Sequence, residues 1–322
     1  MPNNKISIVI STYKREKQLL EILTSLNKQL TPYLSIETIL CDSGSDYNYN
    51  YFQKLNKRLN LIKLDIKDNV LSMKRNIGIM HASYSNIILI DDDCIPDKDF
   101  LFNYAKDFKY LDDYTIISGI VNYPKKYIKK SKYIKFRDSK HFKTNFLNEY
   151  EFLPSNQIVA MNMGFKKTKN FIDIGLFDKR FHGYGFEDYE FAYRYKRNNY
   201  KLKITKASIT HDEGDPNLKK YLNKYYHLGR DGMKNLLKVN KQAAKDTIYY
   251  KIENNFYFKI ITKFFCLNRL LIFFENMILF VDRIRFINFL KIYDFARISS
   301  YVRGYLDRDK SNLTSKSRDW YE

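Results

Sequence analysis

Short apolar runs alternate with helical patterns over the first ninety residues. Each run is short and rich in β-branched residues, so we expect buried strands at ISIVI (6–10), ETILC (37–41), LIKL (61–64) and NIILI (86–90). Apolar residues spaced three and four apart predict a helix face formed by Leu19, Ile22, Leu23, Leu26 and Leu30. The run VLSMKRNIGIMHA (70–82) is also typical of a helix. This order predicts a mostly parallel, doubly wound α/β sheet flanked by helices, with ligands at the carboxyl ends of its strands.

The regular rhythm stops after residue 124 and then returns. The run 124–143 holds nine Lys or Arg against one Asp, which is typical either of a solvated loop or helix face or of a segment that faces an anion or a membrane. Regular patterns return at IVAMNMGF (158–165) and FIDIGLFDKRF (171–181). A helix-like EDYEFAYRYKRN (187–198) and a strand-like KLKITKASITHDE (201–213) follow them.

The last hundred residues differ in kind, because aromatic residues dominate the region 256–290. No stretch there runs beyond six residues without a charge, which excludes a membrane-spanning helix of about 20 apolar residues. The charged positions would point in scattered directions on one ideal helix, so at least two helices are predicted. We therefore expect one domain over residues 1–220 and a helical C-terminal extension over 221–322.

Composition indicates a folded protein with negatively charged partners. Of the 322 residues, 44% are hydrophobic and 16% aromatic, which excludes a disordered chain. The net charge of +20 favours nucleotides, nucleic acid or an anionic membrane surface as partners. Heavy use of Lys, Asn, Ile and Tyr is also typical of an AT-rich genome, which would raise the lysine count without a functional cause.

The cysteines and the N-terminus indicate a reducing compartment. Cys41, Cys94 and Cys266 are an odd number with no CxxC pair, which argues against a disulfide framework or a cysteine zinc site. The apolar run ISIVI is too short for the core of a signal peptide. A cytoplasmic protein is expected, with peripheral attachment to the inner face of the plasma membrane as a further hypothesis.

Three adjacent carboxylates, Asp91, Asp92 and Asp93, follow the apolar run 86–90 directly. Such carboxylates repel one another, and a hard cation such as Mg²⁺ or Mn²⁺ would offset that repulsion and could be shared with substrate phosphates. The alternative is an exposed acidic turn, with Asp97 capping the helix that follows.

Four motifs occur in a fixed order: ISIVISTYKRE (6–16), CDSGSD (41–46), MKRNIGI (73–79) and DDDCIPD (91–97). Together they resemble the nucleotide-binding half of the GT-A fold glycosyltransferases, specifically the large inverting family two. The segment FIDIGLFDKRFHGYGFEDYEFAYR (171–194) resembles the acceptor-side motif of that family and the galactosyltransferase-type pattern G-W-G-x-E-D. Tyr184 and Phe186 depart from that pattern, in which tryptophan and glycine are common. The resemblance covers roughly residues 5–215.

The resemblance implies a site for a nucleotide-linked sugar. Thr12, Tyr13 and Arg15 would line the base pocket. Asp42 would accept the imide N–H of uracil or thymine, which favours UDP or dTDP over GDP. An Asx turn is an alternative for the neighbouring Asp46.

The diphosphate and metal positions follow from the same resemblance. Lys74 and Arg75 would offset the charge of the pyrophosphate, with a surface helix lysine as the alternative for Lys74. In the D-x-D pair, Asp93 would coordinate Mn²⁺ or Mg²⁺, and Asp91 would contact the ribose or the metal through water. Asp92 is expected among the substrate-binding residues, without a specific contact assigned to it.

The second half of the resemblance supplies the acceptor side. Asp188 would be the general base that takes the proton of the acceptor hydroxyl, and Glu187 would bind sugar or acceptor hydroxyls. Gly183 and Gly185 would allow close approach of the backbone to the sugar. The alternative is that the acidic residues are favourable first-turn charges on a helix. His211 would be a third metal ligand, with a structural histidine as the alternative.

The function implied is transfer of a hexose-type sugar, with inversion, from a UDP-sugar to a hydroxyl of a glycan or lipid-linked saccharide. The setting would be bacterial polysaccharide or glycoconjugate assembly, such as that of a capsule. The competing hypothesis is a basic protein that binds nucleic acid or a membrane without catalysis. No nucleic-acid-binding module is recognisable in the sequence, so nucleic acid is not expected as a partner.

Overall fold

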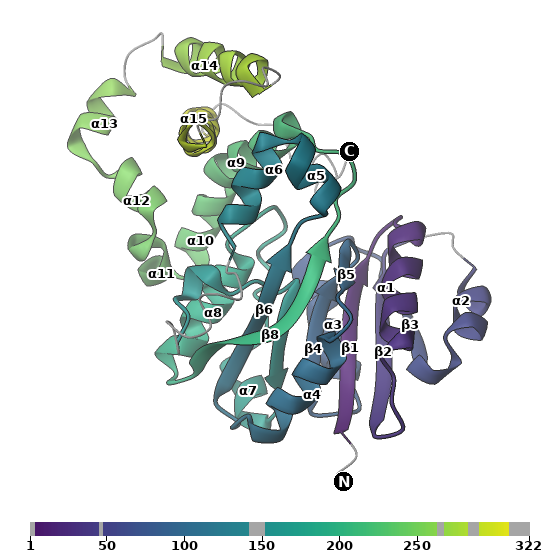
Figure 1. Cartoon of the computed structure of the whole chain (residues 1–322). Coiled ribbons are helices and arrows are strands. Elements are labelled where there is room, and N and C mark those ends of the chain that lie inside the picture. The colour runs from purple at the N-terminus through teal and green to yellow at the C-terminus, as the bar shows by residue number, and fades with distance from the viewer. Residues whose placement is uncertain (1–3, 45–47, 142–151, 263–266, 283–289, 309–322) are drawn as a thin grey trace. The chain divides into compact units, whose positions relative to one another are not determined.

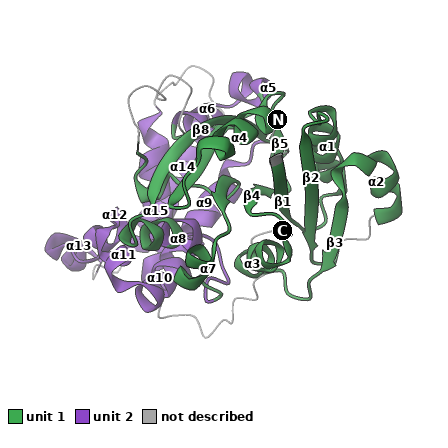
Figure 2. Ribbon diagram, turned by 90° about the horizontal axis from the view of Figure 1, so that it is seen from below, with its two compact units in different colours: residues 1–124, 140–179, 191–214 green, residues 125–139, 180–190, 215–322 purple. Residues whose placement is uncertain are grey.

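The computed structural model of the chain describes residues 4–44, 48–141, 152–262, 267–282 and 290–308. Asp46 and Cys266 lie outside these ranges. The chain forms two compact units that interleave along the sequence (Figure 2). Unit 1 comprises residues 1–124, 140–179 and 191–214, and unit 2 comprises 125–139, 180–190 and 215–322. The expected domain boundary at residue 220 stays a prediction.

Unit 1 contains an eight-stranded sheet, whose strands run side by side in Figure 1. The strands are β1 (Asn4–Thr12), β2 (Leu34–Asp42), β3 (Leu61–Asp65), β4 (Asn86–Asp91), β5 (Cys94–Pro96), β6 (Thr115–Asn122), β7 (Asn162–Lys166) and β8 (Lys201–His211). Their order in the sheet is β3-β2-β1-β4-β7-β6-β8-β5. The pairs among β1–β4 and the pair β6–β8 are parallel, whereas β7 and β5 pair antiparallel with their neighbours. The prediction of a mostly parallel α/β sheet is confirmed.

Both faces of this sheet are covered by helices, which explains why its central strands are apolar runs and do not alternate with polar residues. In β1, Ile6, Ile8 and Ile10 pack with α1 (Glu16–Lys28), α2 (Tyr49–Leu55) and α4 (Phe100–Tyr110). Val9 belongs to the opposite core, with α3 (Leu71–His81), α7 (Lys169–Ile174) and the part of α8 (Glu187–Arg197) that begins at residue 191. The helix predicted from the spacing of Leu19 to Leu30 is α1, whose buried face consists of Leu19, Ile22, Leu23 and Leu26. The helix ends at Lys28, so Leu30 lies beyond it and is half-buried.

Unit 2 is helical. The basic run after residue 124 forms α5 (Lys125–Lys130) and α6 (Lys132–Ser139). The remaining helices of this unit are α9 (Leu218–His227), α10 (Met233–Val239), α11 (Lys241–Asp246), α12 (Ile248–Glu253), α13 (Phe256–Ile261), α14 (Leu267–Asp282) and α15 (Lys291–Asp307), with a π-helical turn at Leu228–Gly232. The expectation of at least two helices within 256–290 is confirmed by α13 and α14. Within the described part of the chain, no helix combines the length and the apolar character that crossing a bilayer requires.

Candidate active site

In-register pairing brings the predicted nucleotide-site residues of unit 1 to one edge of the sheet. Thr12, the last residue of β1, lies opposite Asp42, the last residue of β2. On the other side of β1, Ser11 lies opposite Asp91, the last residue of β4. Because parallel strands end at the same edge, three motifs that are far apart in sequence converge there.

Asp91 forms an ion pair with Arg75 of α3. The Arg75 Nη2 lies 3.1 and 3.3 Å from the two Asp91 carboxylate oxygens, and the guanidinium packs over the Phe177 ring at 5.2 Å. Arg75 is only 2% exposed. The structure therefore places a buried cation on a carboxylate of the acidic triplet.

Arg15 lies against the other two carboxylates. Its Nη1 lies 3.1 Å from Asp92 Oδ1 and also contacts Asp93 Oδ2. The Tyr13 backbone N–H donates to Asp92 Oδ2 at 2.9 Å. Two arginines thus offset the repulsion among the three acids. Asp92 and Asp93 are buried, so the exposed acidic turn considered from the sequence is wrong.

The two buried acids differ in their protonation. Burial, together with the charge of Asp93, raises the pKa of Asp92 to about 7. Burial also opposes ionisation of Asp93, but the neighbouring His211 and Arg15 outweigh it and hold the Asp93 pKa well below its usual range. Of the two buried acids, Asp93 is therefore the one whose surroundings favour the ionised form.

Asp97 does not cap a helix. Its carboxylate accepts hydrogen bonds from Ser208 Oγ at 2.6 Å and Thr210 Oγ1 at 3.1 Å, both on β8. The N-cap of α4 is Asp99, which makes no side-chain capping bond. The capping role that Asp97 had in the alternative interpretation is therefore wrong, because the β5–β8 pairing brings two hydroxyl groups to its side chain.

Asp42 is fully buried at the end of β2, and Lys63 forms an ion pair with it. The Lys63 Nζ lies 3.5 Å from Asp42 Oδ2 and 2.8 Å from Asp65 Oδ1. Its hydrogen bond to Asp65 is the main reason why the Lys63 pKa is raised. Sequence reasoning missed Lys63. The available signal was a lysine near the end of the third predicted strand, beside a strand that ends in a carboxylate.

Lys74 is buried, so the alternative of a surface helix lysine is wrong. It is 2% exposed, its Nζ donates to the Thr12 carbonyl at 2.9 Å, and it lies 5.7 Å from the centre of the Tyr13 ring. Burial lowers its pKa to about 8. Among the described residues, the buried Thr12 Oγ1 has no hydrogen-bond partner. A buried lysine and an unpaired hydroxyl at a strand end are groups that a polar ligand can satisfy.

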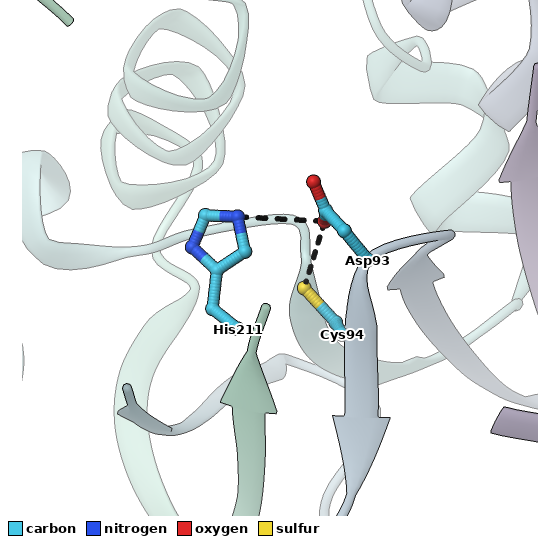
Figure 3. Close-up of side chains that lie close together, drawn as sticks. All are labelled: Asp93, Cys94 and His211. Carbon is cyan, nitrogen blue, oxygen red and sulfur yellow. Dashed lines mark hydrogen bonds and ion pairs between the residues drawn. The ribbon is translucent and has the colours of Figure 1, made fainter. Parts of the chain in front are cut away.

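Asp93, Cys94 and His211 form a compact cluster in which one donor atom of each lies within 4.8 Å of the others. Figure 3 shows the three side chains pointing toward one another. His211 Nε2 and Cys94 Sγ each lie 3.4 Å from Asp93 Oδ1. The cluster forms because β5 and β8 pair with Cys94 opposite His211. Sequence reasoning missed Cys94, since its nearness to His211 depends on strand register alone.

The cluster fits a divalent cation. Ligands bound about 2.1 Å from one ion stand roughly 3.0–3.4 Å apart, which matches the Asp93–His211 spacing of 3.4 Å. Carboxylate and imidazole donors suit Mn²⁺, and an additional phosphate would complete such a set. Burial raises the pKa of the Cys94 thiol well above its usual value, so it acts as a hydrogen-bond donor to Asp93 and not as a thiolate ligand.

Unit 2 contains the first residues of α8. Glu187, Asp188 and Glu190 all lie in the first helical turn, where acidic side chains are favourable. The turn before the helix has positive φ at Gly185 (+91°) and at Phe186 (+71°). A Cβ at Gly185 would also lie 2.5 Å from Leu228 Cδ1, so glycine is required there for backbone and packing reasons. These facts explain the glycine and leave the roles of Glu187 and Asp188 as predictions.

Comparison with known families matches two models to the chain. The model described as glycosyl transferase family 2 matches residues 7–171, just over half of the chain. The model described as the N-terminal domain of galactosyltransferase matches residues 140–214. The first match runs from β1 into α7. It therefore includes the ends of β1, β2 and β4, where Thr12, Asp42 and Asp91 lie, but not the end of β8, where His211 lies.

Relatives and solved structures agree with these matches. A chondroitin synthase from Escherichia coli is 30% identical over 247 residues, covering 65% of this chain and 34% of that protein. A hyaluronan synthase from Pasteurella multocida is 27% identical over 254 residues, covering 66% of this chain and 25% of that protein. The chain thus spans about a quarter to a third of these relatives. The crystal structure of residues 1–349 of S. aureus TarS shares the fold, with a TM-score of 0.53, 15% identity, and coverage of 95% of this chain and 90% of that one. The chain therefore belongs to glycosyl transferase family 2.

Proposed function

We propose that the chain is an inverting, metal-dependent hexosyltransferase that uses a UDP-sugar donor. The observation that carries the proposal is the convergence in unit 1 of Asp42, the acidic triplet and His211 at strand ends. The TarS fragment with this fold has been crystallised in complex with UDP and with UDP-GlcNAc. That similarity supports a uridine nucleotide as the donor carrier here.

In the proposed complex, the donor lies at the ends of β1, β2 and β4. Asp42 accepts the imide N–H of uracil, next to Thr12 and Tyr13. Arg15 completes this base pocket. Lys74 and Arg75 supply positive charge for the diphosphate. Their burial strengthens this interaction, because a charge is screened less in a buried site than in water.

Asp93 and His211 would hold Mn²⁺ or Mg²⁺, with Asp91 directed to the ribose or to a metal-bound water and Asp92 held beside them. The ion would neutralise the charge that develops on the departing nucleoside diphosphate. Cys94 donates its S–H to Asp93 and helps to orient that carboxylate. Arg15 already contacts the same carboxylate, which keeps Asp93 ionised before the nucleotide binds.

The chemical step is a single displacement. The acceptor hydroxyl oxygen forms a bond to the anomeric carbon while the bond from that carbon to the diphosphate oxygen breaks. UDP leaves with the electron pair, and Asp188 takes the proton of the acceptor hydroxyl. Attack from the face opposite the leaving group inverts the anomeric configuration. Glu187 and the Gly185 backbone contact sugar or acceptor hydroxyls in this proposal.

The acceptor is proposed to be a hydroxyl of a glycan or lipid-linked saccharide in bacterial polysaccharide assembly. The names of the relatives support this class: chondroitin synthase, hyaluronan synthase, and poly(ribitol-phosphate) beta-N-acetylglucosaminyltransferase. We also propose that residues 1–220 form the catalytic domain and 221–322 a helical extension. Peripheral attachment to the inner face of the plasma membrane is part of the same proposal.

Calorimetric titration with UDP, with and without Mn²⁺, tests the donor and metal site. Wild type should bind UDP in a metal-dependent manner, and Asp93→Asn should weaken that binding by about tenfold or more, because it removes a ligand charge at nearly unchanged volume. Asp99→Asn is the matched control, since the Asp99 side chain is 64% exposed. If wild type binds none of UDP, GDP and dTDP in the presence of metal, the proposal is wrong.

Steady-state kinetics test the general base. Asp188→Asn should lower kcat by about 10²- to 10⁴-fold while leaving the affinity for UDP unchanged, because a general base acts on the acceptor proton and not on the nucleotide. Product analysis by NMR should show the inverted anomer. Loss of UDP binding together with activity in Asp188→Asn would instead indicate a structural role.

A further inference from the structure

A row of large apolar side chains is exposed along one side of α14 in unit 2. The row, called here the α14 stripe, consists of Leu270, Phe273, Met277 and Phe280. The spacing of three, four and three residues places all four on one helix face. Phe273 and Phe280 are 63% and 64% exposed. Soluble surfaces rarely expose several large apolar residues together, so this stripe requires a binding partner.

The opposite side of α14 is occupied by α15. Leu271 and Ile278 are buried, and Glu275 accepts a hydrogen bond from Ser300 Oγ at 2.8 Å and pairs with Arg303. The helix is therefore held in place by its inner face, and the stripe faces away from α15. The exposure of the stripe results from stable packing of unit 2 and does not depend on a loosely attached helix.

The preceding helix, α13, exposes a second apolar surface in the same unit. Phe256 and Tyr257 are 71% and 73% exposed, and Ile260 and Ile261 are also exposed. The aromatic side chains of both helices are the type that inserts at the boundary between lipid headgroups and acyl chains. Two consecutive helices in sequence thus present apolar side chains that the described part of unit 2 does not cover.

The charges near these helices are mostly positive. Lys259 and Arg269 are exposed on α13 and α14. Both acids of α14 have partners, since Glu275 pairs with Arg303 and Asp282 accepts a hydrogen bond from the Tyr293 hydroxyl. Most of the excess positive charge of the chain also lies in the residues of unit 2.

We propose that the α14 stripe and the exposed side of α13 dock onto an anionic lipid bilayer, lying in its interface and not crossing it. The 16-residue α14 is about 24 Å long, shorter than the roughly 30 Å hydrocarbon layer. Basic residues beside apolar ones match anionic headgroups above acyl chains. A second copy of the chain fits less well, because symmetric pairing would bring like charges together. The inference rests on the peripheral attachment in the proposed function, for which it assigns the surface, and it stands independently of the donor and acceptor.

Vesicle flotation of the full-length chain tests this surface. Wild type should float with phosphatidylglycerol vesicles in 0.1 M NaCl and remain unbound with phosphatidylcholine vesicles. Raising NaCl to about 0.5 M should weaken the binding severalfold, because lipid charge is then screened. The double variant Phe273→Ser/Phe280→Ser should partition at least about tenfold less, because two aromatic side chains no longer insert.

The matched control is Phe102→Ser on α4 of unit 1, which removes an equally exposed phenylalanine (68%) and should float as wild type does. Circular dichroism and melting temperature should be unchanged in all variants, because the replaced side chains are exposed. The proposal is overturned if wild type does not float with anionic vesicles, or if the double variant floats as well as wild type. It is also overturned if light scattering shows a wild-type dimer that the double variant makes monomeric.

Discussion

Lys74 provides a quantitative test, because its ammonium group is buried and, among the described residues, makes no hydrogen bond to a carboxylate. Its Nζ donates to the Thr12 carbonyl at 2.9 Å, and burial lowers its pKa from the usual 10.5 to about 8. Each pKa unit corresponds to about 1.4 kcal/mol, so holding this charge inside the ligand-free protein costs about 3 kcal/mol at neutral pH. The charge of Lys74 therefore destabilises the folded state of the ligand-free protein.

The pH dependence follows from which state holds the proton. Below pH 8, the folded and unfolded states both carry a protonated Lys74, and the full penalty applies. Between pH 8 and 10.5, the folded state has lost the proton while the unfolded state keeps it, so the unfolded state binds more protons and stability rises with pH. The contribution of Lys74 to the free energy of unfolding should therefore improve by about 3 kcal/mol across this window.

The variant Lys74→Met isolates this effect, because methionine has a similar length and no charge. The free energy of unfolding should be measured by urea titration with circular dichroism at pH 7, 8, 9 and 10. Lys74→Met should lack the rise seen in wild type. It also leaves the Thr12 carbonyl without its donor, which costs about 1–3 kcal/mol at every pH. The diagnostic quantity is therefore how the difference in unfolding free energy between wild type and Lys74→Met changes with pH. The absolute size of that difference is not diagnostic.

A control variant replaces the exposed Lys67 by Met, which removes a solvated charge from the same region. A constant difference in unfolding free energy between wild type and Lys74→Met from pH 7 to 10 would refute the reasoning. The reasoning would be refuted equally if the unfolding free energy of wild type fell relative to that of Lys74→Met as the pH rises. Such a fall would mean that the folded state stabilises the lysine charge.

Three further predictions concern the hydrophobic core, the contact between the paired strands β6 and β8, and the proposed metal site. Phe171→Ala should lower the free energy of unfolding, measured by urea denaturation, by about 3–5 kcal/mol. The buried Phe171 ring stacks on Phe165 with 4.2 Å between the ring centres, and a loss below about 1 kcal/mol would contradict this packing. Gly119→Ala should lower the melting temperature by several degrees, because a Cβ at this position of β6 would lie 2.4 Å from the Ala207 carbonyl oxygen of β8. An unchanged melting curve would contradict this prediction and would show that the two strands can separate locally. His211→Ala should weaken Mn²⁺ binding about tenfold or more, as measured by the EPR signal of free Mn²⁺ in the presence of UDP; equal affinity would remove this histidine from the proposed ligand set.

Local patterns in the sequence were enough to predict the architecture of the first half of the chain. Buried runs such as ISIVI became β1, and the spacing from Leu19 to Leu26 became the buried face of α1. Such patterns are reliable because the periodicity of a strand or helix is a property of neighbouring residues. The same reasoning placed Asp42 and the acidic triplet at strand ends, since each follows an apolar run directly. The residue identities of the proposed donor site were thus available from the sequence.

Only the tertiary structure decided which side chains are partners. The pairing of Arg15 with Asp92 and Asp93 joins residues nearly eighty positions apart, and that of Lys63 with Asp42 depends on the β2–β3 pairing. Composition and spacing carry no information about register between distant strands. For this reason, the sequence offered only a metal ion as the counter-charge of these three acids, with an exposed acidic turn as the alternative, whereas arginines supply part of that charge.

Contacts with elements distant in sequence decide both the hydrogen-bond partners of Asp97 and the burial of Lys74. The alternative drawn from the sequence had Asp97 capping the helix that follows it, but β8 brings Ser208 and Thr210 to its carboxylate. Lys74 lies on α3 among residues that read as an ordinary amphipathic helix, and only the packing of that helix on the sheet buries the ammonium. Sequence determined which elements form and which residues end them. Packing and register decided how those residues are charged, paired and shielded from water.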